Sequence, residues 1–333
     1  MPHPAPRNPE CAIPKQLSAA VKAGLKKGWS GLIWLIKILV PVSFATALMV
    51  HYQLLHHLDF FLQPMMTMIH LPASAAVVLV IGIFTGIYGT VAALSVMPFS
   101  MNHMILIAVF TLISHNLIQE SLVQANSGLR FSTAVLFRLG ISFVVTMICG
   151  WIMGVTPGGV GPAVLPASQA VPGPLSVMLI EWAAGTGWLC LKIFCIIMPL
   201  MVVMELARRF HLIEAVTGIT APVLRILGLD KSYALLWMTA AVFGLAYGAA
   251  VIVDETKNRT HDPKSLTRLN LSTGVNHAMI EDPSLFLPLG LPALWLWVPR
   301  LVAAMVAVWL HIGFSWARRF YAARAGHKKL CDY

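Results

Sequence analysis

The sequence predicts an all-α polytopic membrane protein with about ten hydrophobic segments arranged in two inverted repeats. Composition, the length of the apolar runs and a polar motif that occurs twice support this prediction. Of the 333 residues, 58% are hydrophobic and 11% are charged, whereas a soluble domain carries about a quarter charged residues. Several apolar runs approach the roughly 20 residues that a helix needs to cross a bilayer.

The expected segments follow one another along the chain. Residues 17–29 alternate apolar side chains with lysine, as in an amphipathic helix that lies on the membrane surface. The first half has segments at about 30–50, 53–71, 73–97, 103–124 and 131–155. The second half has segments at about 188–207, 212–228, 232–253, 265–282 and 292–317. Whether 53–71 and 212–228 span the membrane or re-enter it is left open.

These segments divide the chain into five parts. We expect a basic N-terminal tail with an interfacial helix (1–29), a first membrane repeat (30–155), a Gly/Pro-rich linker (156–187), a second membrane repeat (188–317) and a basic C-terminal tail (318–333).

The repeat is clearest in two heptapeptides that end apolar stretches. They read Ser114-His115-Asn116-Leu117-Ile118-Gln119-Glu120 and Asn276-His277-Ala278-Met279-Ile280-Glu281-Asp282. His, Ile and an acidic residue recur at a constant spacing of 162 residues. Further matches occur at spacings of 158 (Pro41 with Pro199, Pro64 with Pro222) and 159 (Phe84, Tyr88 and Gly89 with Phe243, Tyr247 and Gly248). Internal repeats of this kind are typical of transporter folds with one site between the halves.

Positive residues predict the orientation, because they accumulate on the cytoplasmic side. The basic clusters that should share this side are Lys15, Lys22, Lys26 and Lys27; Arg208 and Arg209; Lys257, Arg259 and Lys264; and Arg318, Arg319, Arg324, Lys328 and Lys329. The uncharged loop 156–174 suits the outer side. With ten crossings each half has five, and an odd number inverts the second half. If 53–71 and 212–228 are re-entrant, four crossings remain in each half, and the two halves have parallel orientations in the membrane.

The two motifs supply the candidate site. Ionisable side chains at membrane depth are costly and usually mark the path of a polar ligand or ion. The candidate substrate-binding residues are His115, Asn116, Gln119, Glu120, Asn276, His277, Glu281 and Asp282. In continuous helices His115 would share a face with Gln119, and His277 with Glu281, since residues four apart lie together. Pro283 tends to break the second helix, which would expose backbone groups to a ligand.

Three other interpretations of the motifs remain. The polar helix ends could lie at the headgroup level, or they could hydrogen-bond neighbouring helices without touching a ligand. A metal is the third interpretation, because imidazole and carboxylate are ligands for zinc or iron. Its ligands would be His115, Glu120, His277, Glu281 and Asp282, although their spacing matches no metal signature. The five cysteines show no CxxC or metal-binding spacing either.

The paired motifs resemble those of bacterial membrane proteins with the nucleoside-recognition, or Gate, domain. That group is similar to the spore maturation proteins, the membrane part of ferrous-iron transporter B and part of the concentrative nucleoside transporters. The resemblance covers about 30–125 and 188–315. It implies a solute-transport fold with His115, Asn116, Glu120, His277, Glu281 and Asp282 near the site. This chain lacks a GTPase domain, has no cysteine in either motif and is shorter than a full nucleoside transporter.

The resulting hypothesis is a secondary transporter or permease of the bacterial inner (cytoplasmic) membrane, with both termini in the cytoplasm. Its solute would be small, polar and nucleoside-like, and transport would be coupled to a proton or another cation. One of the adjacent carboxyls Glu281 and Asp282 should hold a proton unless a cation lies there, because two like charges cannot both ionise cheaply in a medium of low dielectric constant. The second motif should therefore carry the ion, and the first should bind the solute.

The alternatives are a divalent-metal (iron-like) transporter, a non-transporting membrane scaffold and an intramembrane metal enzyme. We expect no enzyme activity and no cofactor beyond a bound proton, Na⁺ or divalent metal. The expected partners are membrane lipid, a small polar solute or ion, and a second copy or another membrane subunit. Nucleic acid is not expected, because the net charge of +10 resides in tails and loops.

Overall fold

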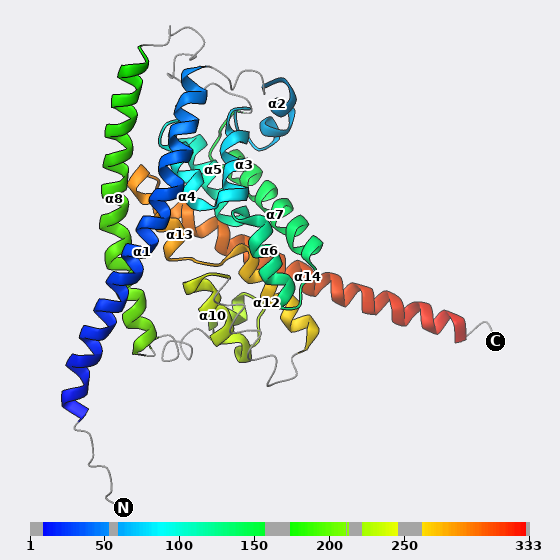
Figure 1. Cartoon of the computed structure of the whole chain (residues 1–333). Coiled ribbons are helices and arrows are strands. Elements are labelled where there is room, and N and C mark those ends of the chain that lie inside the picture. Colours follow the sequence, from blue (N-terminus) through cyan, green and yellow to red (C-terminus); the bar gives the residue numbers. More distant parts are fainter. Residues whose placement is uncertain are drawn as a thin grey trace, which may run out of the picture.

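The structure is a computed structural model, and it describes residues 9–52, 59–156, 174–210, 212, 222–245 and 262–330. In these ranges the fold is all-helical, with twelve α-helices (Figure 1). Five stretches are long and apolar enough to cross a membrane: Lys15–His51, Met101–Asn126, Phe131–Ile152, Leu175–Arg209 and Ala293–Arg318. Large apolar side chains on their outer faces, such as Trp151, Ile180 and Leu310, are exposed, as expected where lipid is the solvent.

Helices α1 (Pro9–His51) and α8 (Leu175–Arg209) pack along one side of the molecule (Figure 1). A Cβ at Gly24 would lie 2.6 Å from Cα of Val202, so the two backbones are close there. Towards the other end, Trp182 Nε1 donates to Ser43 Oγ at 3.1 Å. The contact residues rise along α1 as they fall along α8, and the two helices are therefore antiparallel.

The segment expected to cross at 73–97 instead folds back on itself. Helix α3 (Ala75–Thr85) ends at Gly86, whose φ of 81° and ψ of −168° reverse the chain into α4 (Ile87–Leu94). The two helices pack together, and a Cβ at Gly82 would collide with Thr90. This hairpin replaces the predicted crossing because only glycine adopts this backbone conformation readily.

A similar glycine ends α10 (Ala234–Phe243), where Gly244 has φ 88° and ψ 170°. Gly86 and Gly244 are 158 residues apart, so the structure corrects the spacing of 159 that the match of Phe84 with Phe243 predicted. The residues after 245, including Tyr247, Gly248 and the basic cluster at 257–259, lie outside the described ranges up to 261.

Two further helices break in the middle of the molecule. Helix α5 (Met101–Ser114) stops at His115, and α6 (Leu117–Asn126) begins two residues later. Helix α12 (Pro263–Val275) stops at Asn276, and the short α13 (Glu281–Ser284) and a 3₁₀ turn (Leu287–Leu289) follow. Helices α7 (Phe131–Ile152) and α14 (Ala293–Leu330) pack against these broken helices.

Of the expected segment at 53–71, residues 59–71 lie within the described ranges. Helix α2 (Asp59–Met68) has 10 residues, about 15 Å, which is half the thickness of the hydrocarbon core. The equivalent region near 212–228 is described at residue 212 and from residue 222 onward, where 222–226 are helical.

The hairpin turn gives a stability prediction. Gly86→Ala should lower stability by about 1–3 kcal/mol, because the backbone at Gly86 is unfavourable for any other residue and a Cβ would lie 2.7 Å from the Asn116 amide. Gly140→Ala is the matched control, since no atom lies within 4 Å of the added Cβ in the middle of α7. The free energy of unfolding of this control, measured by thermal unfolding in detergent, should rise by about 0.5–1 kcal/mol. Equal effects of the two substitutions would contradict the tight turn.

Candidate functional site

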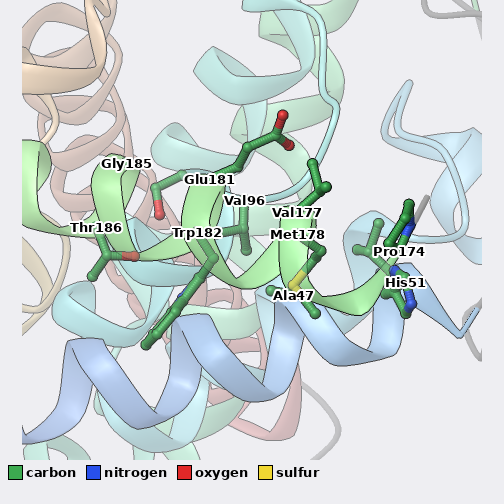
Figure 2. Close-up of a pocket in the computed structure, with 12 residues that line it drawn as sticks. Ala47, His51, Val96, Pro174, Val177, Met178, Glu181, Trp182, Gly185 and Thr186 are labelled. Carbon is green, nitrogen blue, oxygen red and sulfur yellow. The ribbon is translucent and has the colours of Figure 1, made fainter. Parts of the chain in front are cut away.

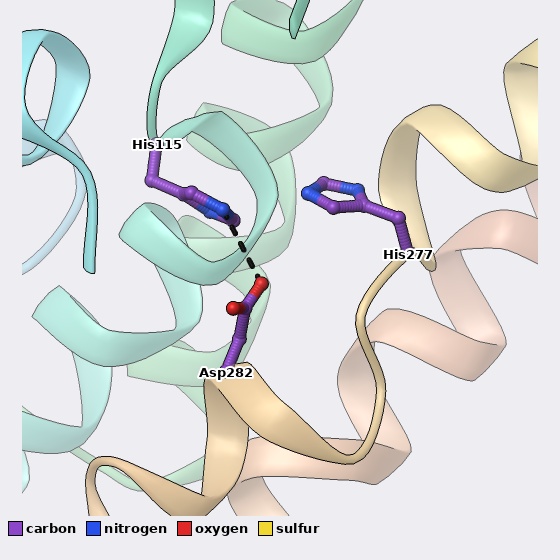
Figure 3. A group of neighbouring side chains, drawn as sticks. All are labelled: His115, His277 and Asp282. Carbon is purple, nitrogen blue, oxygen red and sulfur yellow. Dashed lines mark ion pairs between the residues drawn. The ribbon is translucent and has the colours of Figure 1, made fainter. Parts of the chain in front are cut away.

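The two polar motifs meet in the interior. His115 and His277 are 3% and 0% exposed, and their ring centroids lie 5.0 Å apart with 36° between the planes. Figure 3 shows both rings and the Asp282 carboxylate converging from three segments. Neither imidazole is therefore exposed to water, as the headgroup interpretation of the motifs would require of a solvated helix end.

The helix breaks set the position of each motif. Asn116 and Ala278 occupy equivalent places in the left-handed region, with φ of 44° and 43°. Asn116 N donates to Gly82 O and Ala278 N donates to Ala240 O, each at 3.2 Å. Each break is thus hydrogen-bonded to the helix that ends in the neighbouring glycine turn. This arrangement satisfies backbone groups that a broken helix would otherwise leave unpaired in a membrane.

The backbone also orients both imidazoles in the same way. His115 Nδ1 donates to Thr111 O at 3.0 Å, and His277 Nδ1 donates to Thr273 O at 3.1 Å. A carbonyl oxygen only accepts, so the proton of a neutral imidazole lies on Nδ1 in both residues. The Nε2 atoms then direct lone pairs toward the centre. Backbone-held Nδ1–H groups of this kind fix histidines that bind metals or shuttle protons.

Carboxylates face these Nε2 atoms. His115 Nε2 lies 3.2 Å from Asp282 Oδ2 and 3.4 Å from Glu120 Oε1. His277 Nε2 lies 3.2 Å from Glu120 Oε2. Each carboxylate therefore bridges the halves, because Asp282 approaches the first histidine and Glu120 approaches both. Glu281 forms no ion pair with either imidazole among the described residues and accepts a hydrogen bond from Tyr88 on α4 at 2.9 Å.

Two buried arginines complete the site, and the sequence reasoning missed both. Arg138 Nε and Nη2 donate to Ile113 O and His115 O at 2.9 Å. Arg300 repeats this geometry exactly 162 residues later, donating to Val275 O and His277 O at 3.0 and 2.6 Å. Each guanidinium fills the end of a broken helix, where the carbonyls have no intrahelical partner. Their shared spacing with the histidines was the signal available in the sequence.

The two arginines differ in one contact. Arg138 Nη2 also pairs with Glu120 Oε2 at 2.6 Å, whereas Arg300 has no ion pair with a carboxylate in the described part of the chain. Several buried polar atoms in the same ranges lack a hydrogen-bond partner: Nη1 of both arginines, His277 Nε2, Asp282 Oδ2 and both amide atoms of Asn276. Buried polar groups are normally satisfied, so this cluster is a candidate for water, an ion or a solute.

Not every predicted site residue joins the cluster. Gln119 is exposed, and the expected shared faces of His115 with Gln119 and of His277 with Glu281 are wrong. Those faces assumed continuous helices, but the chain turns at Asn116 and Ala278 and resets the 3.6-residue period. The cluster instead contains His115, Glu120, His277 and Asp282. Asn116 lies against the Gly86 turn, and Asn276 is buried beside the second break.

Three of these residues could hold a metal ion. Ligand atoms of His115, His277 and Asp282 all lie within 4.8 Å of one another. Glu120 is adjacent but is engaged by Arg138, and Glu281 is engaged by Tyr88. The metal-ligand set expected from the sequence is thus reduced to two imidazoles and one carboxylate, with Glu120 as a neighbour.

A hollow of about 400 Å³ lies between α1, the end of α4 and α8 (Figure 2). His51, Ser95, Glu181 and Thr186 supply its polar lining. Trp182 projects toward α1, where its ring packs on Phe44, while Glu181 projects away from α1 (Figure 2). None of the predicted site residues lines this hollow, so it is separate from the histidine cluster.

The arginines give a prediction that separates their roles. Arg138→Gln leaves the Glu120 carboxylate buried without its partner, which costs about 3–5 kcal/mol. Arg300→Gln removes two hydrogen bonds to backbone carbonyls, each worth about 1.5–3 kcal/mol, but it leaves no carboxylate without an ion-pair partner. The free energy of unfolding in detergent should therefore fall more in Arg138→Gln than in Arg300→Gln. Adding Glu120→Gln to Arg138→Gln should restore part of this free energy. A double variant whose loss equals the sum of the losses of the two single variants would contradict the pairing of Arg138 with Glu120.

Comparison with known proteins finds similarity to a bacterial membrane protein. No family model matches the chain, and no solved structure matches it. It is 27% identical over 298 residues to the uncharacterized membrane protein YvoD of Bacillus subtilis (strain 168), with 89% of this chain and 95% of that protein covered. The chain is thus a multi-pass membrane protein with a distant bacterial homologue, and its activity is a matter for proposal.

Proposed function

We propose that the protein is a secondary permease that moves a small polar solute or ion between its two halves. The single observation that supports this function is the buried meeting of His115, His277, Glu120 and Asp282 at two broken helices. Ionisable groups are expensive at membrane depth, and broken helices are tolerated there only where they are buried in protein or line a water-filled cavity. A scaffold would have no need for this arrangement.

We further propose that the halves are inverted repeats. In the first half, α1, the pair α5–α6 and α7 would cross the membrane, while α3–α4 re-enters it. In the second half, α8, the pair α12–α13 and α14 would take the same places. Three crossings per half also invert the second half, so the proposal does not need the ten crossings expected from hydropathy. The antiparallel packing of α1 and α8 supports it.

The solute class follows from the groups available. The buried amide of Asn276 has no hydrogen-bond partner among the described residues for either its donor or its acceptor, which suits a hydrogen-bonding solute such as a nucleoside or base. The second candidate cargo is a divalent metal, favoured by the convergence of His115, His277 and Asp282. Both fit the inner membrane of a bacterium, with the termini in the cytoplasm.

Inversion is testable by thiol labelling. In a background without the native cysteines, Tyr52→Cys at the end of α1 and Arg209→Cys at the end of α8 probe ends that the repeat makes equivalent. An impermeant maleimide should label Tyr52→Cys from outside intact cells and Arg209→Cys only after permeabilisation. Labelling of both from the same side would mean parallel halves.

Transport is testable with purified protein in proteoliposomes and a panel of nucleosides and divalent metals. The parent should accumulate one class, and Glu281→Gln should abolish gradient-driven accumulation while binding persists, because this carboxyl links the second motif to the hairpin through Tyr88. Glu181→Gln, at an exposed position on α8, is the matched control and should transport like the parent. Absence of uptake of every compound would favour a scaffold, and unchanged uptake by Glu281→Gln would refute the role of that carboxyl.

A further inference from the structure

We propose that His115, His277 and Asp282 form a binding site for one divalent transition-metal ion, bound between the two halves of the chain. This inference deepens the proposed permease function, because the ion would be its cargo or its coupling ion. The site joins His115 at the break after α5, His277 at the break after α12 and Asp282 in α13.

The lone pairs of the two imidazoles point toward carboxylate oxygens. Both Nδ1 atoms donate to backbone carbonyls, so both Nε2 atoms of the neutral rings are acceptors. His115 Nε2 nevertheless lies 3.2 Å from Asp282 Oδ2, and His277 Nε2 lies 3.2 Å from Glu120 Oε2. Two acceptors at such distances repel each other unless a positively charged species lies between them. A metal ion or added protons would remove this repulsion.

The candidate ligand atoms lie close to the separation that a bound metal ion requires. Zinc binds imidazole nitrogen and carboxylate oxygen at about 2.0–2.2 Å, so tetrahedral ligands lie roughly 3.3 Å apart. The distance from His115 Nε2 to Asp282 Oδ2 is already 3.2 Å. All three ligand atoms lie within 4.8 Å of one another, so the widest pair would have to approach by at most about 1.5 Å to reach the tetrahedral separation.

The surroundings favour a cation as well. His277 Nε2 and Asp282 Oδ2 have no hydrogen-bond partner within the described ranges, so both are free to become ligands. The neighbouring charged groups are Arg138 and Arg300 against the carboxyls Glu120, Glu281 and Asp282, and Arg138 is committed to Glu120. A cation would therefore enter a site where carboxyl groups outnumber guanidinium groups.

The ligand types define the class of ion. Two imidazoles and one carboxylate suit borderline ions such as Zn²⁺ or Fe²⁺. Ca²⁺ and Mg²⁺ prefer sites made of oxygen ligands, and Cu⁺ prefers sulfur, which this ligand set lacks. Three protein ligands also leave a coordination position open, as expected where an ion must enter and leave.

The test measures metal binding to the full-length protein in detergent, purified with a tag that contains no histidine. Titration with Zn²⁺ by calorimetry and with Co²⁺ by visible absorption should give one ion per chain. Asp282→Asn and His277→Gln should each weaken binding at least tenfold and remove the Co²⁺ band, and thermal unfolding would verify that both variants fold. His51→Ala lies outside the cluster, is the matched control and should bind like the parent.

Each outcome decides one proposal. Loss of binding in the two cluster variants, but not in His51→Ala, supports the site. The proposal is overturned if the parent binds neither Zn²⁺ nor Co²⁺ stoichiometrically, or if Asp282→Asn binds them equally well. Protons shared between the imidazoles and carboxylates would then be what relieves the repulsion of the facing acceptors. Uptake of a solute by proteoliposomes without metal binding would refute only the metal site. Metal binding without uptake of any compound would refute only the permease proposal.

Discussion

The arrangement of the centre depends on how unpaired helix carbonyls are satisfied inside an apolar environment. Two helices stop near the middle of the molecule, and each leaves backbone acceptors that water cannot reach. Arg138 and Arg300 supply the missing donors, with the same pair of bonds to the carbonyls of residues i−25 and i−23. Because those carbonyls belong to the residues at the breaks, the guanidinium groups also fix the histidines. The position of the cluster thus follows from two helix ends whose carbonyls are bound by arginine side chains.

The same breaks explain why the site combines residues from both halves. A straight helix would carry His115 and Glu120 on different faces, about 140° apart. The turn at Asn116 brings their side chains together, and the corresponding turn at Ala278 leaves Asp282 within reach of His115. Asparagine tolerates the left-handed conformation at residue 116, whereas alanine at 278 adopts it only because the surrounding bonds hold it there.

The sequence predicted the class of protein and the important motif, but it did not predict the local path of the chain. Apolar composition and length identify the spans within α1, α5–α6, α7, α8 and α14. They do not identify where α1 and α8 begin, because residues 17–29 and 175–187 continue these helices and do not form a separate interfacial helix and a linker. Hydropathy cannot distinguish a crossing from a hairpin, and the 73–97 segment is apolar throughout although it turns at Gly86. The arginines were overlooked because each stands alone in an apolar run, although their spacing equals that of the histidines. Gln119 was misplaced by assuming a continuous helix.

The shared centre requires contact between the two motifs, and thiol cross-linking tests this contact most directly. In a cysteine-free background, His115→Cys combined with His277→Cys should be joined by a short membrane-permeant bis-thiol reagent, so that cleavage between the halves leaves one band. The control pairs His277→Cys with His103→Cys, which lies twelve residues and about 18 Å from residue 115 along the chain of α5. Efficient joining of the first pair alone is the predicted result. No joining of the first pair, or equal joining of both, would contradict a shared centre.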